Sequence, residues 1–211
     1  MKKIKLHKES FKTLLIHNLW LFLLIPIILS SFFILMFDLM DKPKQKEQIR
    51  IFSSCRVENV TNQLVSGEYK NELSNYGIIE TSISSILEGS VEFSLNFGKT
   101  VFDNFEIIIA SETIYNNYSD MFDSFCVSLD KNYFNEEFNF LNSKNGEKIV
   151  GIKLADLHDD VYNEQFEFSL NFEMYDTTYV FVSNRTENSR RLIDDKHSVS
   201  EYSLKTFLEL M

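Results

Sequence analysis

The sequence predicts an α/β domain preceded by a single transmembrane helix, and three observations lead to this fold class. Residues 13–37 carry no formal charge and are mostly apolar, which is long enough to cross a bilayer as a helix. Beyond them, short apolar runs typical of strands buried on both faces alternate with longer segments of mixed polarity. The pair Asn145-Gly146 indicates a tight turn between two strand candidates.

The first element is a membrane helix, assigned to residues 13–40. A helix in a soluble domain needs one apolar face, whereas residues 19–37 are apolar on every face. Pro26 within this run is tolerated in membrane helices. The alternatives are a cleaved secretory signal, a lipoprotein signal ending at Cys55, and a buried core helix. A cleaved signal would have a shorter apolar core, and the charged stretch at 41–50 separates Cys55 from the helix.

The charges that flank this helix favour a cytoplasmic N-terminus. Five lysines precede the helix, and four basic residues between 42 and 50 follow it among acidic neighbours. The expected organisation is a basic cytoplasmic tail (1–12), an anchor (13–40), a polar stalk (41–48) and an extracytoplasmic α/β domain (49–211). The expected localisation is the cell membrane, in single-pass form, with the C-terminal domain extracellular.

The domain beyond the helix is strongly acidic. Residues 41–211 contain 16 basic and 29 acidic residues, for a net charge of −13. Nucleic acid is therefore excluded as the main partner, because phosphate binding needs a basic face. Aromatic residues make up 14% of the chain, which supplies enough apolar surface for a packed core and argues against disorder.

The secondary structure of this domain follows from apolar patterns. Four strands are predicted, at residues 49–53, 105–110, 149–154 and 178–183. Helices are predicted over residues 57–69 and 200–210, the second capped by Ser198 or Ser200. The Asn145-Gly146 turn predicts a hairpin that ends in the strand at 149–154. Buried strands separated by helices indicate a partly parallel sheet, to which the hairpin adds an antiparallel edge.

One hexapeptide, Glu-Phe-Ser-Leu-Asn-Phe, occurs at 92–97 and again at 167–172. Alternating apolar residues from Val91 to Phe97 predict a strand there. The repeat has two explanations, which are coincidence in a chain rich in Phe, Asn and Ser, or two related halves.

Five segments share a resemblance in order along the chain: IRIFSS at 49–54, EIIIASET at 106–113, KIVGIKLAD at 148–156, TYVFVSNRTENS at 178–189 and YSLKTFLEL at 202–210. Together they resemble extracytoplasmic solute-binding proteins of ABC transporters, and in particular small membrane-anchored relatives from low-G+C Gram-positive bacteria. In those relatives an acidic residue, a four-residue apolar strand and Pro-Glu-Ser follow one another. Glu106 and Glu112 match this pattern, and Ser111 replaces the proline.

The resemblance implies a reduced periplasmic-binding-protein-like mixed sheet that holds a small polar solute. It also implies ABC transporter permease subunits as partners, and a helix rather than a strand at 91–97. In open α/β sheets ligands bind at the carboxyl ends of strands. Six residues at such positions are the candidate ligand contacts: Ser53, Ser54, Ser111, Glu112, Asn184 and Arg185. The alternative is that these side chains cap helices or close turns.

The sequence carries no phosphate-binding glycine loop, nucleophile elbow or His-Glu-x-x-His motif. We therefore expect no enzyme, no catalytic residue, no metal ligands and no cofactor. His158 lies in an acidic segment, which is either a metal site, an oriented base or a solvated loop. Cys55 and Cys126 form one disulfide or remain two buried thiols.

Two functions fit these expectations. The first is a membrane-anchored extracytoplasmic domain that acts as accessory to, or receptor for, an ABC-type transporter. The alternative is a non-enzymatic membrane-tethered scaffold that binds another protein and no small molecule.

Overall fold

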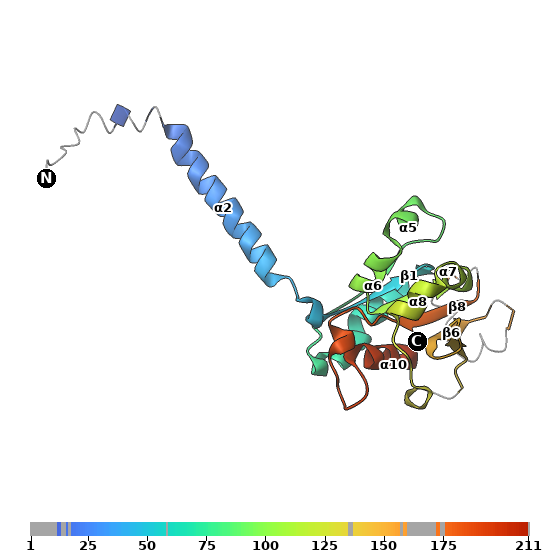
Figure 1. Cartoon of the computed structure of the whole chain (residues 1–211). Helices are drawn as coiled ribbons and strands as arrows, with labels where there is room; N and C mark the ends of the chain where they lie inside the picture. Colours follow the sequence, from blue (N-terminus) through green and yellow to red (C-terminus); the bar gives the residue numbers. More distant parts are fainter. Residues whose placement is uncertain are drawn as a thin grey trace. The chain divides into compact units, whose positions relative to one another are not determined.

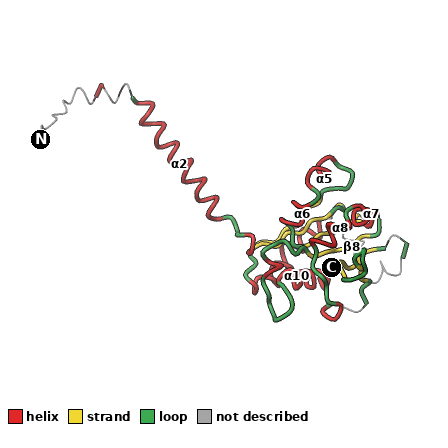
Figure 2. The backbone as a smooth tube through the Cα atoms, in the orientation of Figure 1, coloured by secondary structure: helices red, strands yellow, loops and turns green. Residues whose placement is uncertain are grey.

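The computed structural model describes residues 12–13, 16, 18–57, 59–134, 137–156, 158–159, 172–173 and 176–210. The chain divides into two units, residues 1–42 and 43–211, which are considered separately (Figures 1 and 2). Most of the predicted basic tail and the second hexapeptide at 167–172, except the backbone of Phe172, lie outside the described residues.

The first unit contains helix α2 (Leu19–Asp41), which is 23 residues long and includes Pro26. Its side chains are placed over residues 23–37, where the large apolar ones are exposed. Within the residues that the structure describes, no helix is found that is both long and apolar enough to cross a membrane.

The second unit is built on a mixed sheet of six strands. The strands are β1 (Gln48–Ser53), β3 (Glu80–Ser85), β4 (Ile107–Ser111), β5 (Phe140–Asn142), β6 (Ile149–Ala155) and β8 (Thr178–Val182). Their order is β3-β1-β4-β8-β6-β5. Strand β1 is parallel to both β3 and β4, whereas β8 is antiparallel to β4 and β6, and β5 is antiparallel to β6. A separate pair joins β2 (Arg56–Val57) to β7 (Phe172–Glu173).

Helices cover both faces of the sheet (Figure 1). One face carries α3 (Asn59–Leu64), the π-helix η2 (Val65–Tyr69), α4 (Lys70–Leu73) and α10 (Val199–Leu210). The other carries α5 (Val91–Asn96), α6 (Lys99–Asn104), α7 (Glu112–Asn117) and α8 (Ser119–Phe125). Single 3-10 turns are η1 (Gln45–Glu47), η3 (Ser74–Tyr76), η4 (Lys131–Tyr133) and η6 (Asn188–Arg190).

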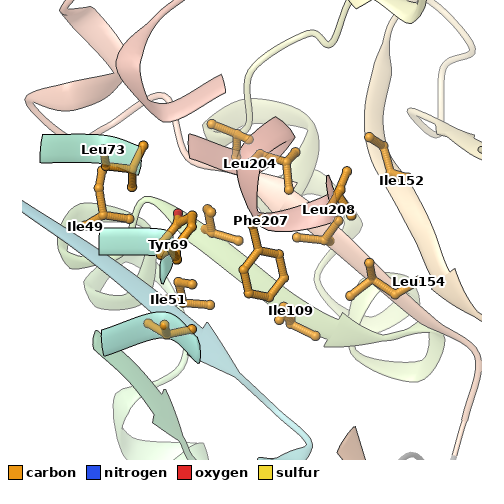
Figure 3. Close-up of a cluster of buried hydrophobic side chains, with 14 of the residues drawn as sticks. Ile49, Ile51, Tyr69, Leu73, Ile109, Ile152, Leu154, Leu204, Phe207 and Leu208 are labelled. Carbon is orange, nitrogen blue, oxygen red and sulfur yellow. The ribbon is translucent and has the colours of Figure 1, made fainter. Parts of the chain in front are cut away.

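Alternate residues of the central strands supply two separate cores. In β4, Ile107 and Ile109 face the α10 side, whereas Ile108 and Ala110 face the α7–α8 side. Figure 3 shows the first core, in which Phe207 of α10 lies between Ile109 and the helical segment that carries Tyr69. Each large apolar side chain buried in this way contributes about 1.5–3 kcal/mol before entropy is counted. The two cores explain why the strands read as continuous apolar runs.

Most predicted elements are confirmed. The four predicted strands correspond to β1, β4, β6 and β8, and the two predicted helices to the α3–η2–α4 segment and to α10. The hairpin is formed by β5 and β6, and Gly146 adopts a φ of 71° in its turn. Helix α10 begins with a capping box, because the Ser198 hydroxyl accepts the Glu201 amide at 3.2 Å while the Glu201 carboxylate accepts the Ser198 amide at 2.8 Å.

The strand predicted at 91–97 is wrong, because residues 91–96 form helix α5. Ser90 caps this helix by accepting the Phe93 amide at 3.0 Å. Phe93 and Phe97 lie four residues apart and stack at 4.6 Å between ring centroids. A period of two also places every second alternating residue at a spacing of four, so the pattern fitted both structures. The helix agrees with the expectation from the resemblance. Strand β3 was not predicted, since its sequence ETSISS is largely polar.

The predicted stalk at 41–48 joins the folded domain earlier than expected. The compact second unit begins at Pro43. Gln45 donates from Nε2 to the carbonyl of Asp103 at 3.1 Å, and Asn188 donates to the carbonyls of Gln45 and Gln48. The domain boundary therefore lies near residue 43 rather than 49.

Candidate functional site

The candidate site is a cavity of about 340 Å³ at the carboxyl ends of β1 and β4. The chain leaves β1 toward the α3–α4 face and leaves β4 toward the α7–α8 face, so the two connections diverge here. Such a divergence opens a crevice outside the strand ends, which is where open α/β sheets bind ligands. The volume is within the range of small-molecule pockets.

Residues from four segments line the cavity. Ser54 and Cys55 follow β1, Leu87 and Glu88 follow β3, Ser111 ends β4, and Asp176 precedes β8. The lining therefore combines two carboxylates, two hydroxyls, one thiol and one apolar side chain.

Hydrogen bonds fix both carboxylates relative to the start of α7. Ser111 donates from Oγ to Glu88 Oε2 at 2.8 Å, and its Oγ also accepts the Ile114 amide. Asp176 Oδ2 accepts the amide and the hydroxyl of Thr113, at 3.0 and 2.8 Å. The cavity is thus held by side chains that also cap α7.

The thiol in the cavity is not poised for nucleophilic chemistry. Burial raises the pKa of Cys55, and the negative charges of Glu88 and Asp176 raise it further. Burial has the largest effect; the hydrogen bonds from Thr178 and Ser54, which lower the pKa, come next, and the two charges contribute least. A reactive cysteine needs an electropositive environment that lowers its pKa, and this environment is acidic.

The structure brings two of the six predicted contact residues into the cavity, Ser54 and Ser111. Ser53 is buried and closes a turn, because its hydroxyl donates to the Cys55 carbonyl at 2.9 Å and accepts the Cys55 amide. Glu112 is the first residue of α7, and its side chain is exposed to solvent.

The remaining two predicted residues, Asn184 and Arg185, lie at the opposite edge of the sheet. Strand β8 runs antiparallel to β4, so its carboxyl end meets the amino end of β4. There Arg185 pairs with Asp103 at 2.8 Å, and Asn184 donates to the carbonyls of Ser124 and Cys126. The prediction that these two join the others is corrected by the direction of β8.

The cysteines are two separate thiols, so of the two alternatives left open by the sequence the structure has the buried thiols and not the disulfide. Cys55 and Cys126 are both free and buried. The backbone of Cys126 forms an isolated antiparallel β-bridge with Ser183, beyond the carboxyl end of β8. Cys55 instead follows the carboxyl end of β1. Burial raises the pKa of the Cys126 thiol as well.

Sequence reasoning missed Cys55 as a lining residue and also missed Leu87, Glu88 and Asp176. Glu88 was missed because β3 was not predicted, so the loop after it had no assigned place. Asp176 was missed because it precedes a strand, and only an antiparallel strand brings its amino end to this edge. A signal for Asp176 was present in the cluster Asp-Thr-Thr directly before an apolar run.

The histidines form no metal centre in the described part of the chain, where no group of three or more potential ligands is found. The backbone amide of His158 donates to Asp156, whose pKa is lowered mainly by the hydrogen bond from Lys153. His197 lies against Tyr133 and is 2.9 Å from Asp194 Oδ2. These contacts are those of turns and loops.

Comparison with protein-family models, with curated proteins and with solved structures found no significant match.

Proposed function

We propose that the chain is a membrane-anchored, non-enzymatic binding protein whose domain holds a small polar solute for an ABC-type transporter. The observation that carries the proposal is the cavity at the divergence of β1 and β4, where two serines and two carboxylates lie among mostly apolar lining surface. Its place in the sheet is the one that general topology favours for ligands. The raised pKa of Cys55 favours binding over covalent catalysis at this site.

The membrane anchor that we propose is the segment 13–40. It is supported by the uncharged, mostly apolar sequence at 13–37, whose length suits a bilayer-spanning helix. The basic residues before it support a cytoplasmic N-terminus and an extracellular domain. Fusion of a reporter to each end, read by protease access in intact cells, tests this topology.

The binding function is tested on the full chain in detergent by a thermal-shift screen. A ligand that binds only the folded state raises the melting temperature as its concentration exceeds Kd. We expect one class of polar solute to stabilise the domain. A substitution that fills the cavity, Ser54→Phe, should abolish that shift, whereas Ser66→Phe on the exposed side of η2 should leave it intact.

A second candidate function has its own observation. Val91 and Leu95 of α5 are each 78% exposed, and Leu87 at the cavity rim is 47% exposed. Exposed apolar groups of this kind favour a protein partner, as in a membrane-tethered scaffold. If no solute shifts a cooperative melting transition, the scaffold becomes the better proposal. Cross-linking from α5 in membranes should then capture one defined partner, which Leu95→Asp should prevent.

A further inference from the structure

We infer that the cavity takes a small organic ligand bearing an ammonium or another cationic group, with Glu88 and Asp176 as its charged partners. The inference rests on the proposed function and narrows its solute class.

The charged groups that line the cavity are both acidic, within a surface that is mostly apolar. The lining contains two carboxylates and, among the described residues, no basic side chain. Asp176 already accepts from Thr113 at Oδ2 and from the Thr177 amide at Oδ1, and Glu88 accepts from Ser111 at Oε2. An ionised carboxylate only accepts hydrogen bonds, so the donors of a ligand would use the remaining lone pairs, above all at Glu88 Oε1, to which no described contact donates. For Glu88 the described hydrogen bond engages Oε2, through Ser111, and directs the carboxylate toward the end of β4. A cationic donor would form charge-assisted hydrogen bonds here, which are the stronger kind.

An anionic ligand does not fit the same cavity. The first three backbone amides of α7, a usual place for an anion to bind, are all engaged. Glu112 donates its amide to the Thr177 carbonyl at 2.7 Å, Thr113 to Asp176 at 3.0 Å, and Ile114 to the Ser111 hydroxyl at 3.2 Å. An anion would therefore meet two carboxylates without amide compensation.

A bare metal ion fits less well than an organic cation. Within the described residues no group of three or more His, Cys, Asp or Glu could hold a metal. A cavity of about 340 Å³ far exceeds the space of one ion. Leu87 adds an apolar wall, which suits the hydrocarbon part of an amine.

The test uses three four-carbon probes that differ in their end groups: putrescine, 1,4-butanediol and succinate. Choline and ethanolamine add further cationic probes, and calcium and magnesium chloride represent metal ions. Full-length chain in detergent is melted with each probe at constant ionic strength. We expect the cationic probes to raise the melting temperature, with putrescine above its isosteric diol, while succinate and both metals do not.

Variants locate the binding. Glu88→Gln should weaken the apparent affinity for the cationic probe roughly tenfold or more, because a charge-assisted hydrogen bond is lost. Glu209→Gln removes the same charge from an exposed position on α10 and should leave the affinity unchanged. Asp176→Asn is a second variant at the site, and its unbound melting temperature shows whether α7 remains capped.

The failures of the two proposals are distinguishable. Stabilisation by the diol, by succinate or by another non-cationic solute, without stabilisation by an amine, overturns the cationic class and leaves solute binding in place. Stabilisation by a metal ion alone also overturns it. Equal amine affinity in wild type and Glu88→Gln overturns the assignment to this cavity. No response to these probes or to the wider screen overturns both proposals.

Discussion

Polar residues have opposite roles at the two ends of the central strands β1 and β4, called here the amino edge and the carboxyl edge of the sheet. At the amino edge of β1 and β4 the polar groups are buried and paired. Glu106 is 1% exposed, its Oε2 accepts the Arg50 amide at 2.8 Å, and Asn188 lies 3.4 Å from its Oε1. At the carboxyl edge, Glu88 and Asp176 border a cavity instead.

This difference separates polar residues that hold the fold from those available to a ligand. At the amino edge the chain enters the domain, and the segment that follows β8 returns to the same place. The polar side chains there therefore form hydrogen bonds with backbone groups of these segments. The carboxyl edge is where the connections diverge, so space remains. A polar residue at a strand end is therefore a ligand candidate only once the strand direction is known.

The largest expected effect concerns Glu106 and pH. Burial raises the pKa of Glu106 to about 7, against a lesser lowering by the hydrogen bond from the Arg50 amide. Its contribution to stability is fully present below about pH 4.5, the unfolded value, and is lost as pH rises through about 7. The free energy of unfolding of the full chain should therefore fall by about 3 kcal/mol between pH 5 and 8.5.

Denaturant titration at several pH values measures this effect, and Glu106→Gln is the matched variant. The variant should lose most of the pH dependence whatever its absolute stability. Groups with lowered pKa values, such as Asp156 and Asp194, change the free energy of unfolding only when the pH falls below about 4. They therefore do not contribute to the change expected between about pH 5 and 8.5. If the free energy of unfolding changed with pH identically in wild type and variant, Glu106 would not be a buried group whose ionisation destabilises the fold.

The next effect compares one substitution at each edge. Asn188→Ala removes the donor to the Gln48 carbonyl, 2.7 Å away, and to the Gln45 carbonyl, and should cost about 2 kcal/mol because two partly buried carbonyls lose their partner. Glu88→Gln at the exposed rim should change stability by less than about 0.5 kcal/mol. Chemical denaturation of both variants tests the contrast, and equal losses would remove the distinction between the edges.

The fold was largely predictable because its signals are local. The buried strands are continuous apolar runs in the sequence. Asn145-Gly146 marks the turn of the hairpin, and Ser198 with Glu201 marks the first turn of α10. Strand β3 escaped because an edge strand with few apolar residues lacks such a signal. Helix α5 escaped because the period of two was compatible with Phe93 and Phe97 on one helical face.

The site was predictable only in part because it depends on topology. Ser54 and Ser111 follow parallel strands, so the rule for strand ends placed them correctly. The same rule misplaced Asn184 and Arg185, since it brings together only the ends of parallel strands and β8 runs antiparallel to β4. Strand direction is decided by long-range pairing, which one sequence does not reveal.

A smaller effect is expected at the salt bridge between Arg185 and Asp103, which closes the surface of the amino edge. Its atoms are 2.8 Å apart, but the side chains are 34% and 39% exposed. Arg185→Ala should therefore cost only about 0.5–1 kcal/mol, including the loss of the contact with the Phe125 ring. Denaturation at low and high salt measures this, and a loss above about 2 kcal/mol would show that the pair is structurally central.

The smallest expected effect is a rate, and it probes the electrostatic difference between the edges directly. In a Cys126→Ser variant, Cys55 reports on the cavity through its reaction with thiosulfonate reagents of opposite charge. The carboxylates of Glu88 and Asp176 should favour the cationic reagent over the anionic one by about threefold or more, relative to the same ratio for free 2-mercaptoethanol.

Glu88→Gln should reduce this charge preference at Cys55, and Glu209→Gln should not. A Cys55→Ser variant reports on Cys126, which is 1% exposed and lies beyond the reach of the cavity carboxylates at the other edge. Its reagent preference should stay close to that of the free thiol. A similar preference at both cysteines would mean that the negative potential is a property of the whole acidic domain, and the carboxyl edge would then lose its claim to select cations.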